Sequence, residues 1–201
     1  MKRSQINGIM SAANDLIRSH GFNLPPFAYW SVDEFRARKD EAKHIIDGRC
    51  GWDITDYGAD QFETMGLFLF TLRNGRLSDL EGGRGMCYAE KLLISRQDQS
   101  DDQGNFAEDR GGVVYCDGIR REYAPGDKLA LAPGESVTLM PGDWHAFWGE
   151  GGDVLIGEVS TVNDDETDNL FREPIGRFAN ITEDVDPLHL LVSDYATWLK
   201  Y

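Results

Sequence analysis

Apolar positions near the N-terminus recur at every third or fourth residue, which is the spacing of one helix face. They predict a helix that ends at Gly21, because glycine often follows the last turn of a helix. The adjacent prolines of the "LPPF" run require an extended chain. A second helix is predicted from Ser31 to Gly48, since Ser31 and Glu34 have the spacing of a capping box. The apolar positions of the first helix are Ile6, Ile9, Met10, Ala13, Leu16 and Ile17.

From Gly66 onward the apolar pattern changes to a period of two, which is typical of strands. The run "GLFLFTLRNGRL" predicts a strand followed by a hairpin turn at Asn74-Gly75. Further short strands alternate with turn residues at even intervals, a spacing that favours a β-sandwich or β-barrel, and "LHLLV" is a candidate to close the sheet. These strands are Met86–Arg96, Gly112–Cys116, Arg120–Tyr123, Lys128–Ala132, Ser136–Met140, Trp144–Trp148 and Asp153–Ser160.

Composition narrows the class of protein. The 201 residues are enough for one domain with a well-buried core, and no linker-like stretch divides them. A formal charge of -15 repels phosphate backbones and anionic lipid surfaces, which argues against nucleic-acid and membrane roles. The chain begins without an apolar signal run, and its three cysteines are odd in number. We therefore expect a cytoplasmic protein.

The stretch "SVTLMPGDWHAFWG" contains one histidine, His145, on a predicted strand. If Gly151-Gly152 is a two-residue hairpin turn, His145 faces Glu158 on the next strand, and both side chains point to the same face. Such a pair has three interpretations: a buried ion pair, a metal ligand with its neighbour, or a catalytic acid and base. The sequence alone leaves all three open.

Several stretches together resemble a known family. "GESVTLMPGDWHAFWGEGG" is similar to the second cupin motif, in which a histidine ligand follows a proline-glycine turn. The chain also resembles the D-lyxose isomerases, and the resemblance runs from end to end. The stretches that carry it are "MKRSQIN", "LPPFAYW", "GWDITDYG", "FTLRNGR", "YAEK", "GEVSTVNDDETDN" and "EPIGRF".

The resemblance implies a fold. It predicts a single, mainly β domain over residues 1–201, namely a cupin-type β-barrel (double-stranded β-helix) with two N-terminal helices packed outside. The helical segment spans residues 1–50 and the barrel spans residues 66–192. Family members are usually homodimers, which is the expectation for this chain.

The resemblance also implies a reaction. D-lyxose isomerases interconvert D-lyxose and D-xylulose, and some interconvert D-mannose and D-fructose, by moving a proton through an enediol. They use a divalent metal, usually manganese, held by three histidines and a glutamate. Here the resemblance gives His145 as a metal ligand. Four residues are catalytic candidates: Glu158 from the hairpin register, and Lys91, Asp168 and Arg177 from the stretches that resemble the family. A surface lysine is the alternative for Lys91, and an ion pair that orders a long loop is the alternative for Asp168 and Arg177.

Three of the four family ligands have no match in this sequence. The first cupin motif, a His-x-His pair followed by a glutamate, should come after "YAEK", but no histidine lies between Gly51 and Trp144. The simplest alignment omits the hairpin that carries this motif and joins Gln99 to Ser100. Glu108 and His189 are the alternatives for a substitute ligand.

We accordingly expect weak or absent manganese binding and poor isomerisation by this chain. Two other functions stay open. One is a sugar-binding or regulatory cupin without a metal, and the other is a structural partner of an intact paralogue.

Overall fold

The computed structural model describes residues 1–97, 111–164, 171, 175–176 and 178–199. The chain forms two compact units, a larger unit of Met1–Asp101 with Trp148–Tyr201 and a smaller unit of 102–147. The single domain that we expect from the sequence stays a prediction. The fold class is confirmed, because the described chain is mainly β, with two antiparallel sheets and few helices, consistent with a cupin-type fold.

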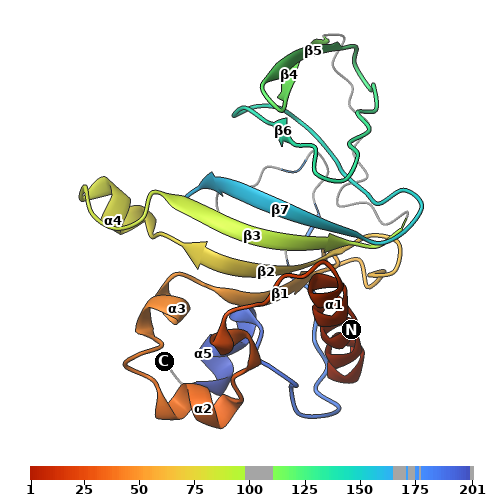
Figure 1. Ribbon diagram of the computed structural model, residues 1–201. Helices are drawn as coiled ribbons and strands as arrows, with labels where there is room; N and C mark the ends of the chain where they lie inside the picture. The colour runs from red at the N-terminus through yellow and green to blue at the C-terminus, as the bar shows by residue number, and fades with distance from the viewer. Residues whose placement is uncertain (98–110, 165–170, 172–174, 177, 200–201) are drawn as a thin grey trace. The chain divides into compact units, whose positions relative to one another are not determined.

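The larger unit is built on a four-stranded antiparallel sheet with the order β1-β2-β3-β7 (Figure 1). Its strands are β1 (Gly51–Thr55), β2 (Leu67–Asn74), β3 (Tyr88–Ser95) and β7 (Val154–Thr161). The β2, β3 and β7 predictions from the sequence are confirmed within one or two residues at most ends. The β1 strand was not predicted, because all five of its residues are buried and the period-two alternation is therefore missing.

One face of this sheet packs against α1 (Arg3–Ser19), the predicted first helix. The buried apolar side of α1 meets large aromatic side chains, and Trp52 stacks on Phe68 and lies edge-on to Phe70. The Trp52 indole also donates a 2.8 Å hydrogen bond to the Ala28 carbonyl in the short 3-10 helix η1 (Pro26–Tyr29). The helix position outside the sheet agrees with the sequence prediction.

The predicted second helix is wrong as one continuous helix. The structure has α2 (Val32–Ala37) and α3 (Lys43–Asp47), with turns between them. The intervening residues carry charges and are exposed, and only Ala42 among them is buried, so no continuous apolar stripe supports a longer helix. Both predicted ends are confirmed, since Ser31 forms the capping box and Gly48 is the C-cap of α3.

The predicted hairpin turn at Asn74-Gly75 is also wrong. The connection from β2 to β3 is longer and contains α4 (Leu77–Glu81). Gly75 serves close packing instead: a Cβ atom there would lie 2.1 Å from the Met86 carbonyl oxygen. The Asn74 side chain forms hydrogen bonds away from this connection, as described below.

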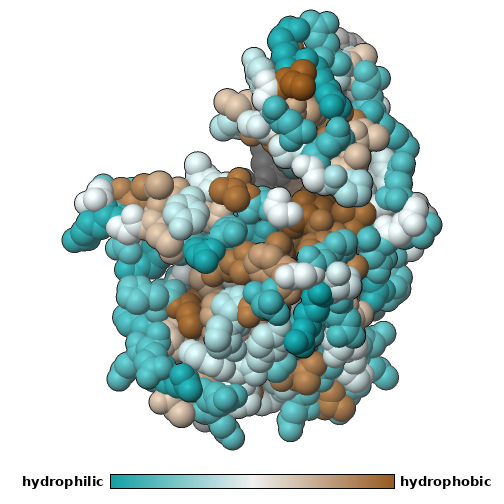
Figure 2. Space-filling view, viewed as in Figure 1, coloured by the Kyte–Doolittle hydropathy of each residue, from teal (hydrophilic) through white to brown (hydrophobic). Residues whose placement is uncertain are grey.

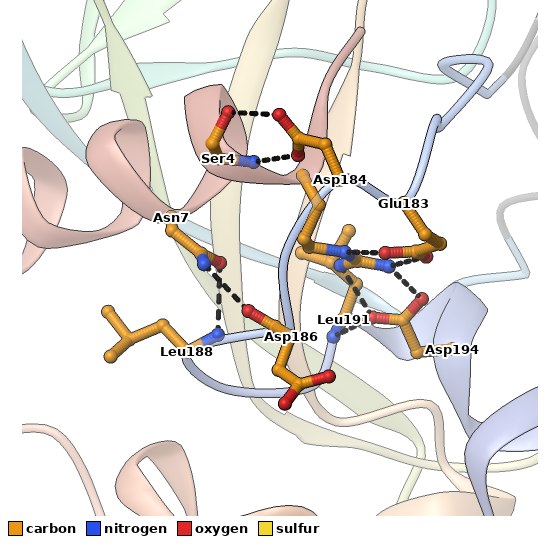
Figure 3. A network of polar contacts seen from close by, with 9 residues as sticks. Ser4, Asn7, Glu183, Asp184, Asp186, Leu188, Leu191 and Asp194 are labelled. Atoms are coloured by element: carbon orange, nitrogen blue, oxygen red, sulfur yellow. Dashed lines mark hydrogen bonds and ion pairs between the residues drawn. The ribbon is translucent and has the colours of Figure 1, made fainter.

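The C-terminal segment fastens the N-terminus of α1 (Figure 3). Arg3 is fully buried and donates two hydrogen bonds to Glu183, at 2.8 and 2.6 Å, and two to Asp194, at 2.9 and 2.7 Å. Burial opposes its charge, but these bonds outweigh the burial and raise the pKa of the guanidinium above its usual value. The segment ends in η2 (Val192–Asp194) and α5 (Tyr195–Trp198), which the sequence did not predict. The "LHLLV" run provides one bridge, between Leu191 and Trp52 of β1.

The smaller unit contains a three-stranded antiparallel sheet with the order β5-β4-β6. Its strands are β4 (Gly112–Cys116), β5 (Ile119–Tyr123) and β6 (Val137–Thr138). Asp117 and Gly118 form the two-residue turn, both with positive φ. The predicted strands Lys128–Ala132 and Trp144–Trp148 are wrong, because these residues join no ladder among the described residues.

The face of the larger unit that Figure 2 shows is mostly hydrophilic, with apolar side chains along the sheet. Val159 of β7 is 76% exposed. Within the described part of the chain, the structure has no helix that is both long and apolar enough to span a bilayer.

Candidate functional site

A polar row crosses the sheet on the face that points away from α1. The strand register sets Thr71 of β2 opposite Lys91 of β3, and Lys91 opposite Glu158 of β7. Directly opposed residues share one face of a sheet, so these three side chains lie side by side. The Lys91 ammonium is 4.0 Å from a Glu158 carboxylate oxygen. The row therefore places a cation and a carboxylate next to each other.

The two charged groups differ in burial. Lys91 is only 5% exposed, whereas the Glu158 side chain is 39% exposed. A buried ammonium needs acceptors, and Lys91 also donates a 2.6 Å hydrogen bond to the Asn163 side-chain oxygen. Asn163 follows the end of β7. The Glu158 carboxylate is thus accessible to a solute, whereas the Lys91 ammonium is buried and fixed by its hydrogen bond to Asn163.

The neighbouring row on the same face is largely apolar. Asp53 of β1, Leu69, Leu93 and Ile156 oppose one another across the four strands. The Asp53 carboxylate accepts a 2.8 Å hydrogen bond from the Ile54 backbone, and Leu69 and Leu93 are buried. Apolar side chains beside the polar row lower the local dielectric, which strengthens the interaction between Lys91 and Glu158.

A β-bulge in β2 decides which residue stands near Lys91. The register shifts between Thr71 and Arg73, so that Arg73 opposes Glu90 and Asn74 opposes Ala89. Arg73 consequently faces the opposite side of the sheet from Lys91, where it pairs with Glu90. Without the extra residue, Arg73 would share the face of Lys91 and place a second positive charge there. The bulge substitutes the neutral amide of Asn74.

His145 lies in the smaller unit, three residues after Gly142 of the predicted Pro141-Gly142 turn, which is present with Gly142 at a φ of +94°. His145 is exposed, and its Nδ1 is 3.0 Å from the Asp143 carbonyl oxygen. The hairpin that predicted its pairing with Glu158 is not formed, because residues 144–148 make no strand and β7 pairs with β3. The juxtaposition of His145 and Glu158 stays a prediction.

The other candidates fall in three groups. Asp168, Arg177 and Glu108 lie outside the described residues. His20, the C-cap of α1, and His44 of α3 are both exposed, so neither is placed to serve as a ligand in the interior. His189 lies edge-on to Tyr29, and its Nδ1 is buried without a hydrogen-bond partner among the described residues. Burial lowers the pKa of His189, so its ring is neutral at neutral pH.

The described residues do not fit a manganese site. No three His, Cys, Asp or Glu side chains of the described residues come together as a ligand cluster. Glu158 faces the Lys91 ammonium, and a fixed positive charge at 4.0 Å disfavours a divalent cation at that carboxylate.

Sequence reasoning found Lys91 and Glu158 but missed Thr71, Asn74 and Asn163. Asn163 stands within the "GEVSTVNDDETDN" run that carries the family resemblance, so the signal for it was present. Asn74 was interpreted as a turn residue because it precedes glycine. Asn74 lies opposite Ala89 only because of the bulge, and no sequence pattern predicted that bulge.

Comparison with known proteins identifies the family. The family model described as D-lyxose isomerase matches residues 1–102 and 98–195. The chain belongs to the D-lyxose isomerase family. A D-lyxose/D-mannose isomerase from Serratia proteamaculans is 38% identical to it, over 99% of this chain and 100% of the relative. Another from Escherichia coli O157:H7 is 36% identical, over 97% of this chain and 98% of the relative.

The same comparisons show that this family member is short. The alignment with the Serratia protein has 229 positions, and 99% of 201 residues is about 199, so about 30 positions hold no residue of this chain. The Escherichia coli alignment has 225 positions, and 97% of 201 is about 195, which again leaves about 30. The two stretches matched by the family model meet at residues 98–102, and Gln99-Ser100, the predicted join, lies there.

Proposed function

We propose that this chain is an aldose–ketose isomerase that interconverts D-lyxose and D-xylulose, and D-mannose and D-fructose. The names of its two relatives and its membership of the D-lyxose isomerase family support this activity. The observation that assigns this activity to particular residues is the Lys91–Glu158 pair, whose charged groups lie 4.0 Å apart on one face of the sheet. Asp168 and Arg177 are proposed as further catalytic residues from the family resemblance alone.

The two groups divide the chemistry of proton transfer between neighbouring sugar carbons. In the open-chain aldose, the Glu158 carboxylate removes the proton from C2, and the bonding pair becomes the C1–C2 double bond of the enediol. Negative charge then develops on O1, and the Lys91 ammonium stabilises it. Return of the proton from Glu158 to C1, with transfer of the O2 proton to O1, gives the ketose. Each group must reach one sugar at once, which a separation of 4.0 Å allows.

The test is wash-in of deuterium from heavy water into D-lyxose and D-xylulose, followed by NMR. Exchange at a sugar carbon reports proton transfer even where net turnover is slow. Glu158→Gln and Lys91→Met should each lower the wash-in rate by roughly a hundredfold, the lower end for a general acid or base. Glu90→Gln is the matched control, because Glu90 is adjacent to Lys91 on β3 but faces the opposite side and pairs with Arg73.

Outcomes of this test separate the proposed enzyme from its alternatives. Binding of D-lyxose or D-mannose with no wash-in would point to a sugar-binding or regulatory protein. Co-purification with a longer relative, with neither binding nor wash-in alone, would point to a structural partner. Equal wash-in rates for Glu158→Gln and Glu90→Gln would contradict the role given to Glu158.

The family resemblance implies manganese as the metal of this reaction, and we propose that this chain binds it weakly or not at all, because no three potential ligands come together among the described residues. We propose that the chain lacks the first cupin motif, with the absent positions at Gln99-Ser100. Two features support this: the shortfall of about 30 positions, and the meeting of the two matched stretches at residues 98–102. His145 is then the remaining histidine of the family's ligand set. We place the protein in the cytoplasm, since Cys50, Cys87 and Cys116 are all free.

We also propose a homodimer. β7 is the last strand in the order of the four-stranded sheet, and its Val159 is 76% exposed. Strand edges with exposed apolar side chains favour pairing between chains. Sedimentation at micromolar concentration should give the mass of two chains, and Val159→Lys should shift it toward one. A sharp monomer for the unmodified chain would contradict this proposal.

A further inference from the structure

The Asn74 side chain ties three separate segments together. Its amide nitrogen donates to the Asn163 carbonyl at 2.8 Å and to the Gly48 carbonyl at 3.1 Å, and its amide oxygen accepts from the Asn163 backbone nitrogen at 3.0 Å. Asn74 is only 8% exposed, so these bonds are shielded from water. The two-way bond to Asn163 reproduces the pairing of a β-bridge, with a side chain in place of one backbone.

Asn163 in turn holds Lys91. While its backbone is fixed by Asn74, its side-chain oxygen accepts the 2.6 Å hydrogen bond from the Lys91 ammonium. The adjoining packing leaves little freedom for this segment: Val162 is buried, and a Cβ atom on Gly75 would meet it at 2.7 Å. The hydrogen bonds from Asn74 therefore help to set the position of the Lys91 acceptor.

We propose that Asn74 is a positioning residue of the isomerase site: through Asn163 it fixes the Lys91 ammonium in the row that contains Glu158. The role of Asn74 in catalysis rests on the proposed function, but its effect on Lys91 can be measured without any isomerase activity. The β-bulge serves the same end, since it brings Asn74 rather than Arg73 to this face of the sheet. The Asn74 side chain forms its hydrogen bonds with Gly48 and Asn163, so its effect on Lys91 is transmitted through Asn163.

The chain offers a matched control in Asn7 of α1 (Figure 3). Its amide nitrogen donates to the Asp186 carbonyl at 2.9 Å, and its oxygen accepts from the Leu188 backbone nitrogen at 2.9 Å. Asn7 thus makes the same two-way bond between a side chain and a distant segment, but this segment does not hold Lys91. Asn7→Asp and Asn74→Asp each replace an amide donor with a carboxylate oxygen facing a carbonyl.

The experiment measures the rate at which formaldehyde and a borohydride reagent methylate Lys91 in the folded protein, by mass spectrometry of peptides. Lys43, whose side chain is 62% exposed, is the reference in the same sample. Asn74→Asp and Asn163→Ala should each raise the Lys91 rate roughly tenfold, the effect of losing one hydrogen bond to a charged group. Asn7→Asp should leave it unchanged. The double variant Asn74→Asp/Asn163→Ala should match Asn163→Ala alone, because Asn74 acts through Asn163.

Asn74→Ala is measured beside Asn74→Asp, because it sets no negative charge against the two carbonyls and is the milder change for folding. A normal Lys91 rate in folded Asn74→Ala, with a raised rate in Asn163→Ala, would overturn the inference. A Lys91 methylation rate raised equally in Asn7→Asp and Asn74→Asp would also overturn the inference, because a general loss of stability would then explain both. Absence of deuterium wash-in with the predicted methylation pattern would remove the proposed function and leave the positioning of Lys91 by Asn74 intact.

Discussion

Insertion of the relatives' additional segment between Gln99 and Ser100 should raise D-lyxose turnover by roughly a thousandfold or more, since a metal supplies several kcal/mol of charge stabilisation. The segment would come from the Serratia isomerase, whose alignment has about 30 positions without a residue of this chain. The family resemblance places three of four metal ligands in that segment. Manganese bound after dialysis and initial rates of D-xylulose formation are the two measurements.

The control for this insertion is a segment of equal length made of glycine and serine. It restores the length of the connection after β3 without supplying ligands, so it should recover neither manganese nor turnover. A second control carries the family segment in the His145→Ala background, which should again bind manganese weakly. Full turnover in the glycine-serine chain would show that length, rather than ligands, limits the unmodified chain.

Arg3→Ala should lower the free energy of unfolding by about 3–5 kcal/mol, the cost of leaving a buried charge without its partner. Arg3 is fully buried, and Asp194 is 6% exposed with two of its hydrogen bonds coming from Arg3. The network also attaches the first turn of α1 to the C-terminal segment, so the loss spreads to the packing of that helix. The free energy of unfolding of both proteins, the variant and the unmodified chain, is measured by urea denaturation monitored by circular dichroism.

The matched comparison is Arg36→Ala. Arg36 is about half exposed and pairs with Asp33, so its removal should cost less than about 1 kcal/mol. Arg3→Lys separates charge from geometry, because lysine keeps the charge but cannot form two forked pairs. Similar losses for Arg3→Ala and Arg36→Ala would contradict the importance given to the buried network.

This network also predicts a dependence on pH. The hydrogen bonds from Arg3 lower the pKa of Glu183 below its usual value. A carboxyl whose pKa is lower in the folded state contributes stability above its unfolded pKa of about 4.3 and loses it as the pH falls through the folded pKa. The contribution is small, because Glu183 is partly exposed. The Arg3→Ala variant should show a weaker loss of stability in this range.

Patterns of period two and period 3.6 predicted α1, β2, β3, β4, β5 and β7, because each of these elements has one polar and one apolar side or is bounded by clear turn residues. The same reasoning failed for β1, which is buried on both faces, and for α4, which occupies a connection where Asn74-Gly75 suggested a hairpin. A local sequence pattern cannot reveal that the asparagine of an Asn-Gly pair forms hydrogen bonds with a residue as distant in sequence as Asn163.

The candidate site was predictable only in part, for a similar reason. Lys91 and Glu158 were named from family stretches, but their contact depends on the pairing of β3 with β7, which are more than 50 residues apart in sequence. The sequence instead paired Glu158 with His145 through a hairpin that is not formed. A register argument depends entirely on which strands are neighbours, and turn residues such as Gly151-Gly152 do not decide that.

The most direct test of the account is the manganese content of the unmodified chain after dialysis, measured together with its turnover of D-lyxose. We expect well below one manganese per chain and a rate that rises only when the missing segment is restored, because His145 and at most Glu158 remain as ligands. Stoichiometric manganese with a rate equal to that of the Serratia relative would contradict the account. It would mean that residues such as Glu108 or His189, or a partner subunit, complete the metal site.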